Sequence, residues 1–161
     1  MGHAIVCFDM TGQLLQESQI EFSCYWNTRW IENETKTPDH DVLDKNGNIL
    51  PTGQALAIWG NFLGKQIVKT SSSNPFVAYS SYTPDKRKLF VYIINKSEVG
   101  QTVSIHVDGY KVSSIEQIWE YFGKNPWDKL PVWQQNETNK TVKKVQLKGT
   151  SITVFELTVS K

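Results

Sequence analysis

The chain has 161 residues, of which 39% are hydrophobic and 20% are charged, the composition of an ordinary globular protein. Its formal net charge of +1 gives no reason to expect a nucleic-acid partner or an anionic membrane surface. No apolar run approaches the roughly 18 residues that cross a bilayer, so we expect no membrane span. Residues 1–3 do not resemble a signal peptide, and the compartment stays open.

Residues 2–15 are predicted to form a helix. Apolar residues recur at a spacing that gives one buried face, although Gly12 weakens the pattern. A short polar turn over 16–19 follows.

Residues 20–26 are predicted to form a buried strand, since Ile20, Phe22, Cys24 and Trp26 alternate with polar residues. The strand ends in a group of two tryptophans, an amide and a permanently charged guanidinium. Flat aromatic faces can stack on a sugar ring while the polar groups bond to its hydroxyls. The candidate carbohydrate-binding residues are therefore Trp26, Asn27, Arg29 and Trp30. Alternatively, the two tryptophans belong to a core or a domain interface.

One helix followed by one strand cannot build a parallel sheet, so the beginning of the chain is predicted to be an incomplete α/β segment. Residues 32–48 form a polar loop containing the run Asp39-His40-Asp41. Three adjacent residues seldom point at one ion, so we expect a solvated loop and no metal site.

Residues 51–67 are predicted to form a second helix, with Pro51 in its first turn and an apolar stripe through Trp59. The linker 71–75 then divides the chain into two predicted domains, 1–70 and 71–161.

Beyond the linker the pattern changes to strands only. Six strands are predicted, at 76–83, 88–94, 103–107, 115–122, 142–147 and 152–159. They indicate an antiparallel β-sandwich. The fold class is therefore mostly β, a sandwich preceded by a helix–strand–helix segment of an incomplete (β/α) barrel. The aromatic loop 123–135 contains Trp127 and Trp133, and it either binds a ligand or covers a sheet edge.

The sequence contains no phosphate-binding glycine loop, zinc-binding cysteine set or nucleophile elbow, so no cofactor is predicted. None of the carboxylates near the Trp-rich strand stands out as half of a catalytic pair, and no catalytic residue is assigned. Cys7 and Cys24 are expected to be buried thiols, with a disulfide left open. N-x-S/T triplets occur at Asn33, Asn95, Asn136 and Asn139 and are weak indicators of secretion.

The chain resembles the C-terminal part of retaining (β/α)8-barrel glycoside hydrolases, especially the α-L-arabinofuranosidase type with an appended β-sandwich. Four stretches carry the resemblance: G-H-A-I-V-C-F-D-M-T-G-Q-L-L, I-E-F-S-C-Y-W-N-T-R-W, D-V-L-D-K-N-G-N-I-L-P-T-G-Q-A-L-A-I-W-G-N-F-L and G-T-S-I-T-V-F-E-L. The resemblance implies that 2–15 is the seventh barrel helix, 20–26 the eighth strand, 51–67 the eighth helix and 76–161 the sandwich.

The resemblance also implies roles for single residues. Trp26 would line the subsite where the bond is cleaved, after a candidate cis bond from Tyr25, and Asn27 and Arg29 would contact substrate. The catalytic glutamates would follow the fourth and seventh strands, upstream of residue 1. The chain alone is therefore expected not to hydrolyse a glycoside.

Two interpretations follow. In the first, the chain is the C-terminal fragment of a glycosidase acting on an arabinose- or xylose-containing glycan. In the second, it is a free-standing carbohydrate-binding or interaction module without chemistry. In the first interpretation the strand at 20–26 has lost both barrel neighbours, so its unpaired edges and apolar face are expected to favour self-association.

Overall fold

The computed structural model describes residues 1–25, 27–29, 40–137 and 144–160. In chain order it contains helices α1 (Gly2–Gln16) and α2 (Pro51–Phe62), followed by the strands. These are β1 (Gln66–Val68), β2 (Phe76–Tyr82), β3 (Lys88–Asn95), β4 (Gln101–Val103), β5 (Lys111–Phe122), β6 (Val132–Glu137), β7 (Val145–Leu147) and β8 (Ser151–Ser160). Among the described residues, neither helix is long and apolar enough to cross a membrane.

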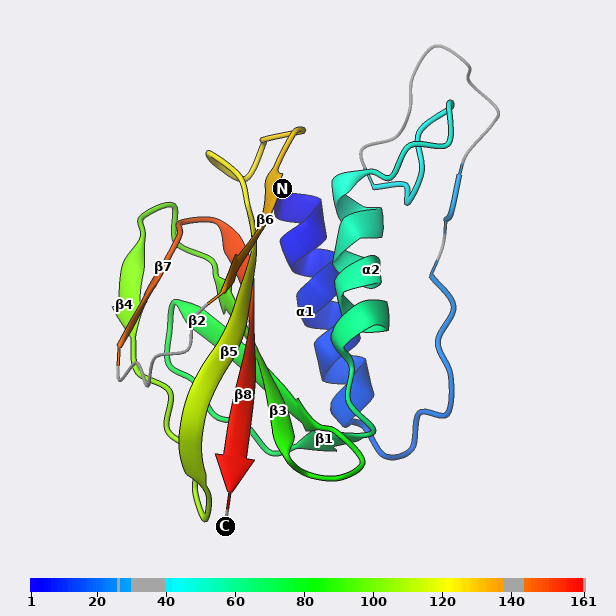
Figure 1. Ribbon diagram of the computed structural model, residues 1–161. Helices are drawn as coiled ribbons and strands as arrows, with labels where there is room; N and C mark the ends of the chain where they lie inside the picture. The colour runs from blue at the N-terminus through cyan, green and yellow to red at the C-terminus, as the bar shows by residue number, and fades with distance from the viewer. Residues whose placement is uncertain (26, 30–39, 138–143, 161) are drawn as a thin grey trace.

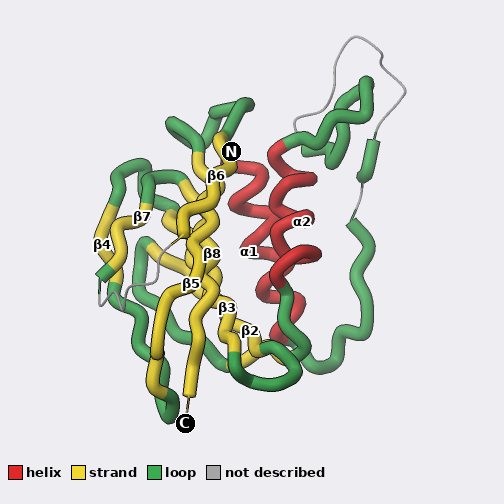
Figure 2. Tube along the Cα trace, in the orientation of Figure 1, coloured by secondary structure: helices red, strands yellow, loops and turns green. Residues whose placement is uncertain are grey.

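The strands form two antiparallel sheets. The larger has the order β1-β2-β3-β8-β5-β6, and the smaller pairs β4 with β7. Figure 1 shows three layers: the two helices cover one face of the large sheet, and the β4–β7 pair covers part of the other. The same layering is visible in Figure 2, where the helices lie on one side of the strands. The prediction of a mostly β, antiparallel sandwich with an added helical segment is confirmed.

The helices and the sheet share one apolar core. Phe8 of α1 stacks on Trp59 of α2 with ring centroids 4.4 Å apart, and Tyr92 of β3 lies 4.5 Å from the same Trp59 ring. Because strand side chains alternate, Tyr92 and Ile94 of β3 point to this face, together with Ile152 and Val154 of β8. Burying side chains of this size stabilises the fold by roughly 1.5–3 kcal/mol each.

The side chains on the opposite face of these strands form a second core, which lies beneath the small sheet. Its buried members are Leu89, Val91, Ile93, Ile115, Leu147, Phe155, Leu157 and Val159. The long strands β3 and β8 are therefore apolar on both faces, which explains their nearly continuous hydrophobic sequences.

A polar network fastens α1 to the sheet. The buried Asp9 carboxylate accepts hydrogen bonds from the Tyr79 hydroxyl and from Lys96 Nζ, the latter at 2.8 Å. Gln13 Nε2 also donates to it, at 3.2 Å. Gly12 lies against the same tyrosine: a Cβ there would come within 2.5 Å of the Tyr79 ring. The glycine that weakened the helical pattern is thus explained by a close approach of helix and strand.

The second predicted helix ends earlier than expected. Instead of reaching residue 67, α2 stops at Phe62, and residues 66–68 form β1. A Cβ at Gly64 would overlap the Tyr82 carbonyl, and the Gly64 N–H donates to Ser81 Oγ at 2.8 Å. The chain therefore passes directly from α2 onto the edge of the sheet, and β1 joins the sheet from the N-terminal side of the linker at 71–75.

The prediction of a buried strand at 20–26 is wrong for residues 20–25, and residue 26 lies outside the described residues. Residues 20–25 run alongside the helices without belonging to a strand, and the Phe22 side chain is 83% exposed. A strand requires a hydrogen-bonded neighbour, and none of the described residues supplies one. Cys24 is exposed, Cys7 is buried, and both thiols are free.

Some of the predicted sandwich strands have other bounds in the structure. β4 ends at Val103, so residues 104–107 are not in a strand, and the aromatic loop 123–135 contains the start of β6. The strands predicted at 76–83, 88–94 and 152–159 are present with shifts of one residue at their ends, and β5 begins four residues before its predicted start. Of the strand predicted at 142–147, residues 145–147 form β7, and residues 142–143 lie outside the described residues.

Candidate functional site

The described part of the predicted site, residues 27–29, lies at the end of the molecule where both helices begin (Figure 1). From this end α1 runs the length of the sheet, and residues 17–25 return beside the helices. After the loop 40–50, α2 begins at the same end as α1. Residues 27–29 are thereby brought to the beginning of α2. Neither of the two described helices has a side-chain cap at its start, and at α1 the Gly2 N–H donates to the Pro126 carbonyl at 2.6 Å.

Asn27 and Arg29 take different positions at this end. Asn27 is buried, with 8% of its surface exposed, whereas Arg29 is exposed. Arg29 Nη2 donates a hydrogen bond to the Lys45 carbonyl at 2.6 Å, and the Thr28 carbonyl accepts from the Leu43 N–H at 3.0 Å. Residues 27–29 therefore hold the loop 40–50 in place. Trp26 and Trp30, together with the Tyr25–Trp26 bond, lie outside the described residues, so their predicted stacking role stays a prediction.

The loop 40–50 is organised by Asp44. Its carboxylate accepts hydrogen bonds from the Asn48 side chain and from the backbone N–H groups of Asn48 and Asn46, each at 2.8 Å. These bonds hold the pKa of Asp44 below its ordinary value. Gly47 completes the turn with a φ of 83°, a conformation that favours glycine.

The base of the loop contains a buried carboxylate, Asp41, beside the start of α2. The Tyr25 hydroxyl donates to the His40 carbonyl at 2.8 Å. Burial raises the pKa of Tyr25, with further contributions from Cys7 and Asp41. His40 Nε2 lies 3.8 Å from Asp41 Oδ1. Within the described part of the chain, no three histidine, cysteine or carboxylate side chains gather as ligands for one metal ion.

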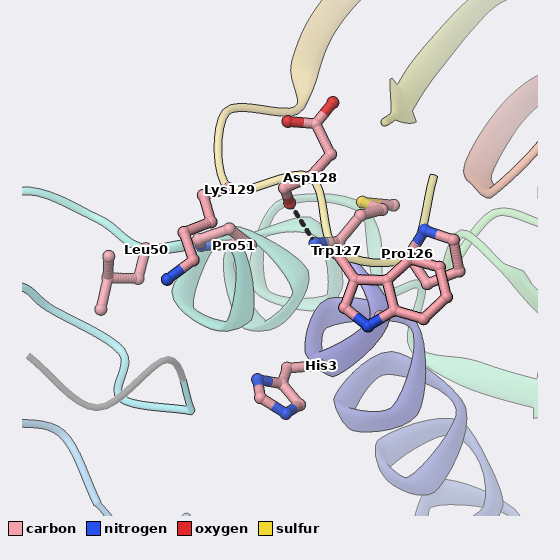
Figure 3. Close-up of a pocket in the computed structure, with 9 residues that line it drawn as sticks. His3, Leu50, Pro51, Pro126, Trp127, Asp128 and Lys129 are labelled. Carbon is pink, nitrogen blue, oxygen red and sulfur yellow. Dashed lines mark hydrogen bonds between the residues drawn. The ribbon is translucent and has the colours of Figure 1, made fainter. Parts of the chain in front are cut away.

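A cavity of about 330 Å³ opens at the same end, between the starts of α1 and α2 and the loop 123–131 (Figure 3). His3 comes from α1, Leu50 and Pro51 come from the start of α2, and Trp127 and Lys129 come from the loop. The indole of Trp127 is 78% exposed. The sequence predicted an aromatic loop that contains Trp127, but it gave no indication that this loop lies beside the two helices.

Side-chain caps hold the loop of this cavity in one shape. The Asp128 carboxylate accepts from the N–H groups of Lys124 at 2.8 Å and Leu130 at 2.9 Å, and Asn125 Oδ1 accepts from the Trp127 N–H at 3.0 Å. The loop is also tied to α1, because the Gly2 N–H donates to the Pro126 carbonyl at 2.6 Å. The sequence N-P-W-D at 125–128 indicates such a turn, because Asn and Asp side chains favour turns.

The side chains at this end can bind a ligand through hydrogen bonds and an aromatic face. A general acid in glycoside cleavage needs a raised pKa. Backbone N–H groups instead hold the pKa of Asp128 below its ordinary value, as similar bonds do for Asp44. Both carboxylates serve to shape loops. Residues 27–29 offer an amide and a guanidinium, and the cavity offers an imidazole, an ammonium group and an exposed indole. Each set can bond to the hydroxyl groups of a ligand, and the indole adds a flat apolar face.

No protein-family model and no curated protein matches the chain. Solved structures of glycoside hydrolases do match its fold. A family 30 subfamily 8 xylanase from Clostridium acetobutylicum superposes with a TM-score of 0.69 and 13% identity, over 98% of this chain and 39% of that one. A GH30 endoxylanase from Clostridium papyrosolvens C71 gives a TM-score of 0.64 and 12% identity, over 96% and 38%.

Arabinofuranosidases match over a smaller part of the chain. The thermostable GH51 α-L-arabinofuranosidase from Thermotoga petrophila RKU-1 gives a TM-score of 0.56 and 16% identity, over 73% of this chain and 31% of that one. At such identities the similarity shows a glycoside hydrolase-like fold and nothing finer. The chain spans between about a fifth and two fifths of the length of these structures.

Proposed function

We propose that the chain is the C-terminal part of a retaining (β/α)8 glycoside hydrolase that acts on an arabinose- or xylose-containing glycan. The observation that carries the proposal is the superposition of 98% of the chain on 39% of a xylanase, a share large enough to include both the helices and the sandwich. In this proposal residues 1–70 supply the last barrel elements, and residues 71–161 form the sandwich that supports them.

An apolar groove beside the helices supports this proposal. It has a volume of about 370 Å³ and lies between residues 20–25 and the two helices. Its lining includes Met10, Leu15, Ile20 and Phe22, all of which have exposed side chains. In a barrel, the outward faces of strands pack against helices in this position. Strands supplied by a longer chain would bury these side chains.

The position of Asn27 and Arg29 supports a role in substrate binding. They follow residues 20–25 and lie against the loop 40–50 that leads into α2. In (β/α)8 enzymes the active site is built at the end where the helices start. We propose that both residues contact substrate hydroxyls, together with Trp26 and Trp30. The catalytic carboxylates belong to other parts of the enzyme.

The second candidate function is a carbohydrate-binding module that works without chemistry. The exposed indole of Trp127 favours it, because a module of this kind needs only an aromatic surface and hydrogen-bonding groups. The two functions differ in whether any form of the protein breaks a glycosidic bond.

Hydrolysis of aryl arabinofuranoside and aryl xyloside tests the proposal. The chain alone is expected to be inactive, whereas the chain extended by the stretch encoded upstream in its gene is expected to be active. In the active form Arg29→Ala should lower kcat/KM about tenfold or more, as for the loss of a charged hydrogen bond. Arg87→Ala is the matched control, because Arg87 is an exposed arginine in the β2–β3 turn. Cleavage by the chain alone, or an upstream stretch without barrel strands, would overturn the proposal.

A further inference from the structure

The cavity between the two helix starts and the loop 123–131 has features of a binding site that the proposed function does not use. It is formed by three segments that are far apart in sequence, at 1–3, 50–51 and 126–129. Its volume of about 330 Å³ is at the lower end of the range for small-ligand sites. The cavity therefore fits one or two sugar rings better than a large cofactor.

The most unusual residue at the cavity is Trp127. A tryptophan is seldom left 78% exposed, because its side chain is the largest apolar group available for burial. Here the caps from Asn125 and Asp128 and the bond between Gly2 and Pro126 hold its loop against α1. The ring is thus presented on an ordered loop, so a ligand that stacks on it does not first have to order the loop.

The polar side chains of the cavity complement the ring. His3 of α1 and Lys129 of the loop line the same space as Trp127 (Figure 3). An imidazole and an ammonium group can both donate hydrogen bonds to hydroxyl oxygens, and the ammonium has three donors. Pro51 and Pro126 add apolar walls. An indole face, apolar walls and two polar side chains match the two-sided character of a sugar ring.

We propose that this cavity is a second glycan-binding subsite, in which Trp127 stacks on a sugar ring and His3 and Lys129 bond to its hydroxyls. The choice of a glycan as ligand rests on the proposed function. The subsite itself is distinct from the one assigned to Asn27 and Arg29, since none of its lining residues comes from 27–29. It gives the sandwich a direct part in holding a carbohydrate chain, in addition to covering helices.

Nuclear magnetic resonance of the purified chain tests the subsite. The indole N–H signal of Trp127 is assigned by its loss in Trp127→Ala, and the chain is then titrated with xylo-oligosaccharides and arabino-oligosaccharides. We expect the Trp127 signal to shift with one of them, and Trp127→Ala to weaken binding about tenfold through loss of the stacking contact. Trp127 is exposed, so the variant should keep its melting temperature.

Leu130→Ala is the matched control, because Leu130 lies on the same loop, is 87% exposed and does not line the cavity. It should bind the oligosaccharide as the wild type does. The subsite is refuted if no oligosaccharide shifts the Trp127 signal, or if Trp127→Ala binds as tightly as Leu130→Ala. Hydrolysis by the extended chain would in that case leave the proposed function standing. Trp127-dependent binding without hydrolysis by the extended chain would support the subsite and overturn the proposed function.

Discussion

The network around Asp9 makes a prediction that can be worked out from the structure. We expect Lys96→Met to lower the free energy of unfolding at pH 7, because it removes the ammonium group 2.8 Å from the Asp9 carboxylate. A hydrogen bond to a charged group contributes roughly 1.5–3 kcal/mol. The Lys96 side chain is 45% exposed, and solvent screening reduces that range to about 1–2 kcal/mol.

The effect should depend on pH with a definite sign. Burial pushes the pKa of Asp9 up, but hydrogen bonds from Lys96, Tyr79 and Gln13 more than offset it and hold the pKa below its ordinary value. A carboxyl group whose pKa is lowered by folding stabilises the protein above its unfolded pKa of about 3.9. That contribution is lost as the pH falls through the folded value. The difference between wild type and Lys96→Met should therefore be largest at neutral pH and should shrink as the pH falls below about 3.9.

Urea unfolding followed by tryptophan fluorescence at pH 7 and pH 2 measures both quantities. Trp59 packs against Phe8 and Tyr92 at the helix–sheet contact, so its fluorescence should change when unfolding breaks that contact. Lys65→Met is the control, since Lys65 is an exposed lysine outside the Asp9 network. An equal loss of stability at the two pH values, or an equal loss in both variants, would refute the role assigned to the ion pair.

Three other results are expected. Gly12→Ala should destabilise the protein by about 1–3 kcal/mol, because the new Cβ meets the Tyr79 ring. Gly60→Ala, where no atom lies within 4 Å of the new Cβ, should stabilise it by about 0.5–1 kcal/mol, and equal shifts in melting temperature would contradict this contrast. Phe22→Ser should reduce self-association in light scattering, and a chain that is monomeric at all concentrations would contradict the expectation. Asn95 should stay unglycosylated by mass spectrometry after expression in eukaryotic cells, since its buried amide donates to two backbone carbonyls; a glycan there would contradict the fold.

Elements with a long, regular pattern could be predicted from the sequence. The helix expected at 2–15 is α1 at 2–16, and the alternation expected at 152–159 is β8 at 151–160. The three residues of β1 are too few to show a period, and their conformation depends on pairing with β2. The polar edge strand β6 has a partner on one side only, so it lacks the apolar alternation of a core strand.

The candidate site was predictable only where it is local in sequence. Asn27 and Arg29 were predicted because a hydrophobic run ends beside them, and hydrogen bonds of residues 28 and 29 hold this segment against the loop 40–50 that leads into α2. Their role in binding stays a prediction. The cavity around Trp127 depends on contacts between residues more than 100 positions apart, such as Gly2 with Pro126. No pattern within a short window of sequence contains such a contact.

The position of β8 has a consequence for how this protein is made. Among the described strands β8 is the last in chain order, yet it lies between β3 and β5, and within that part of the chain it alone joins the β1-β2-β3 ribbon to the β5–β6 hairpin. During synthesis the edges of β3 and β5 that face β8 stay unpaired until residues 151–160 have been made. Strand pairings across such long sequence separations form slowly. The newly made chain would then be most vulnerable to aggregation just before residues 151–160 emerge.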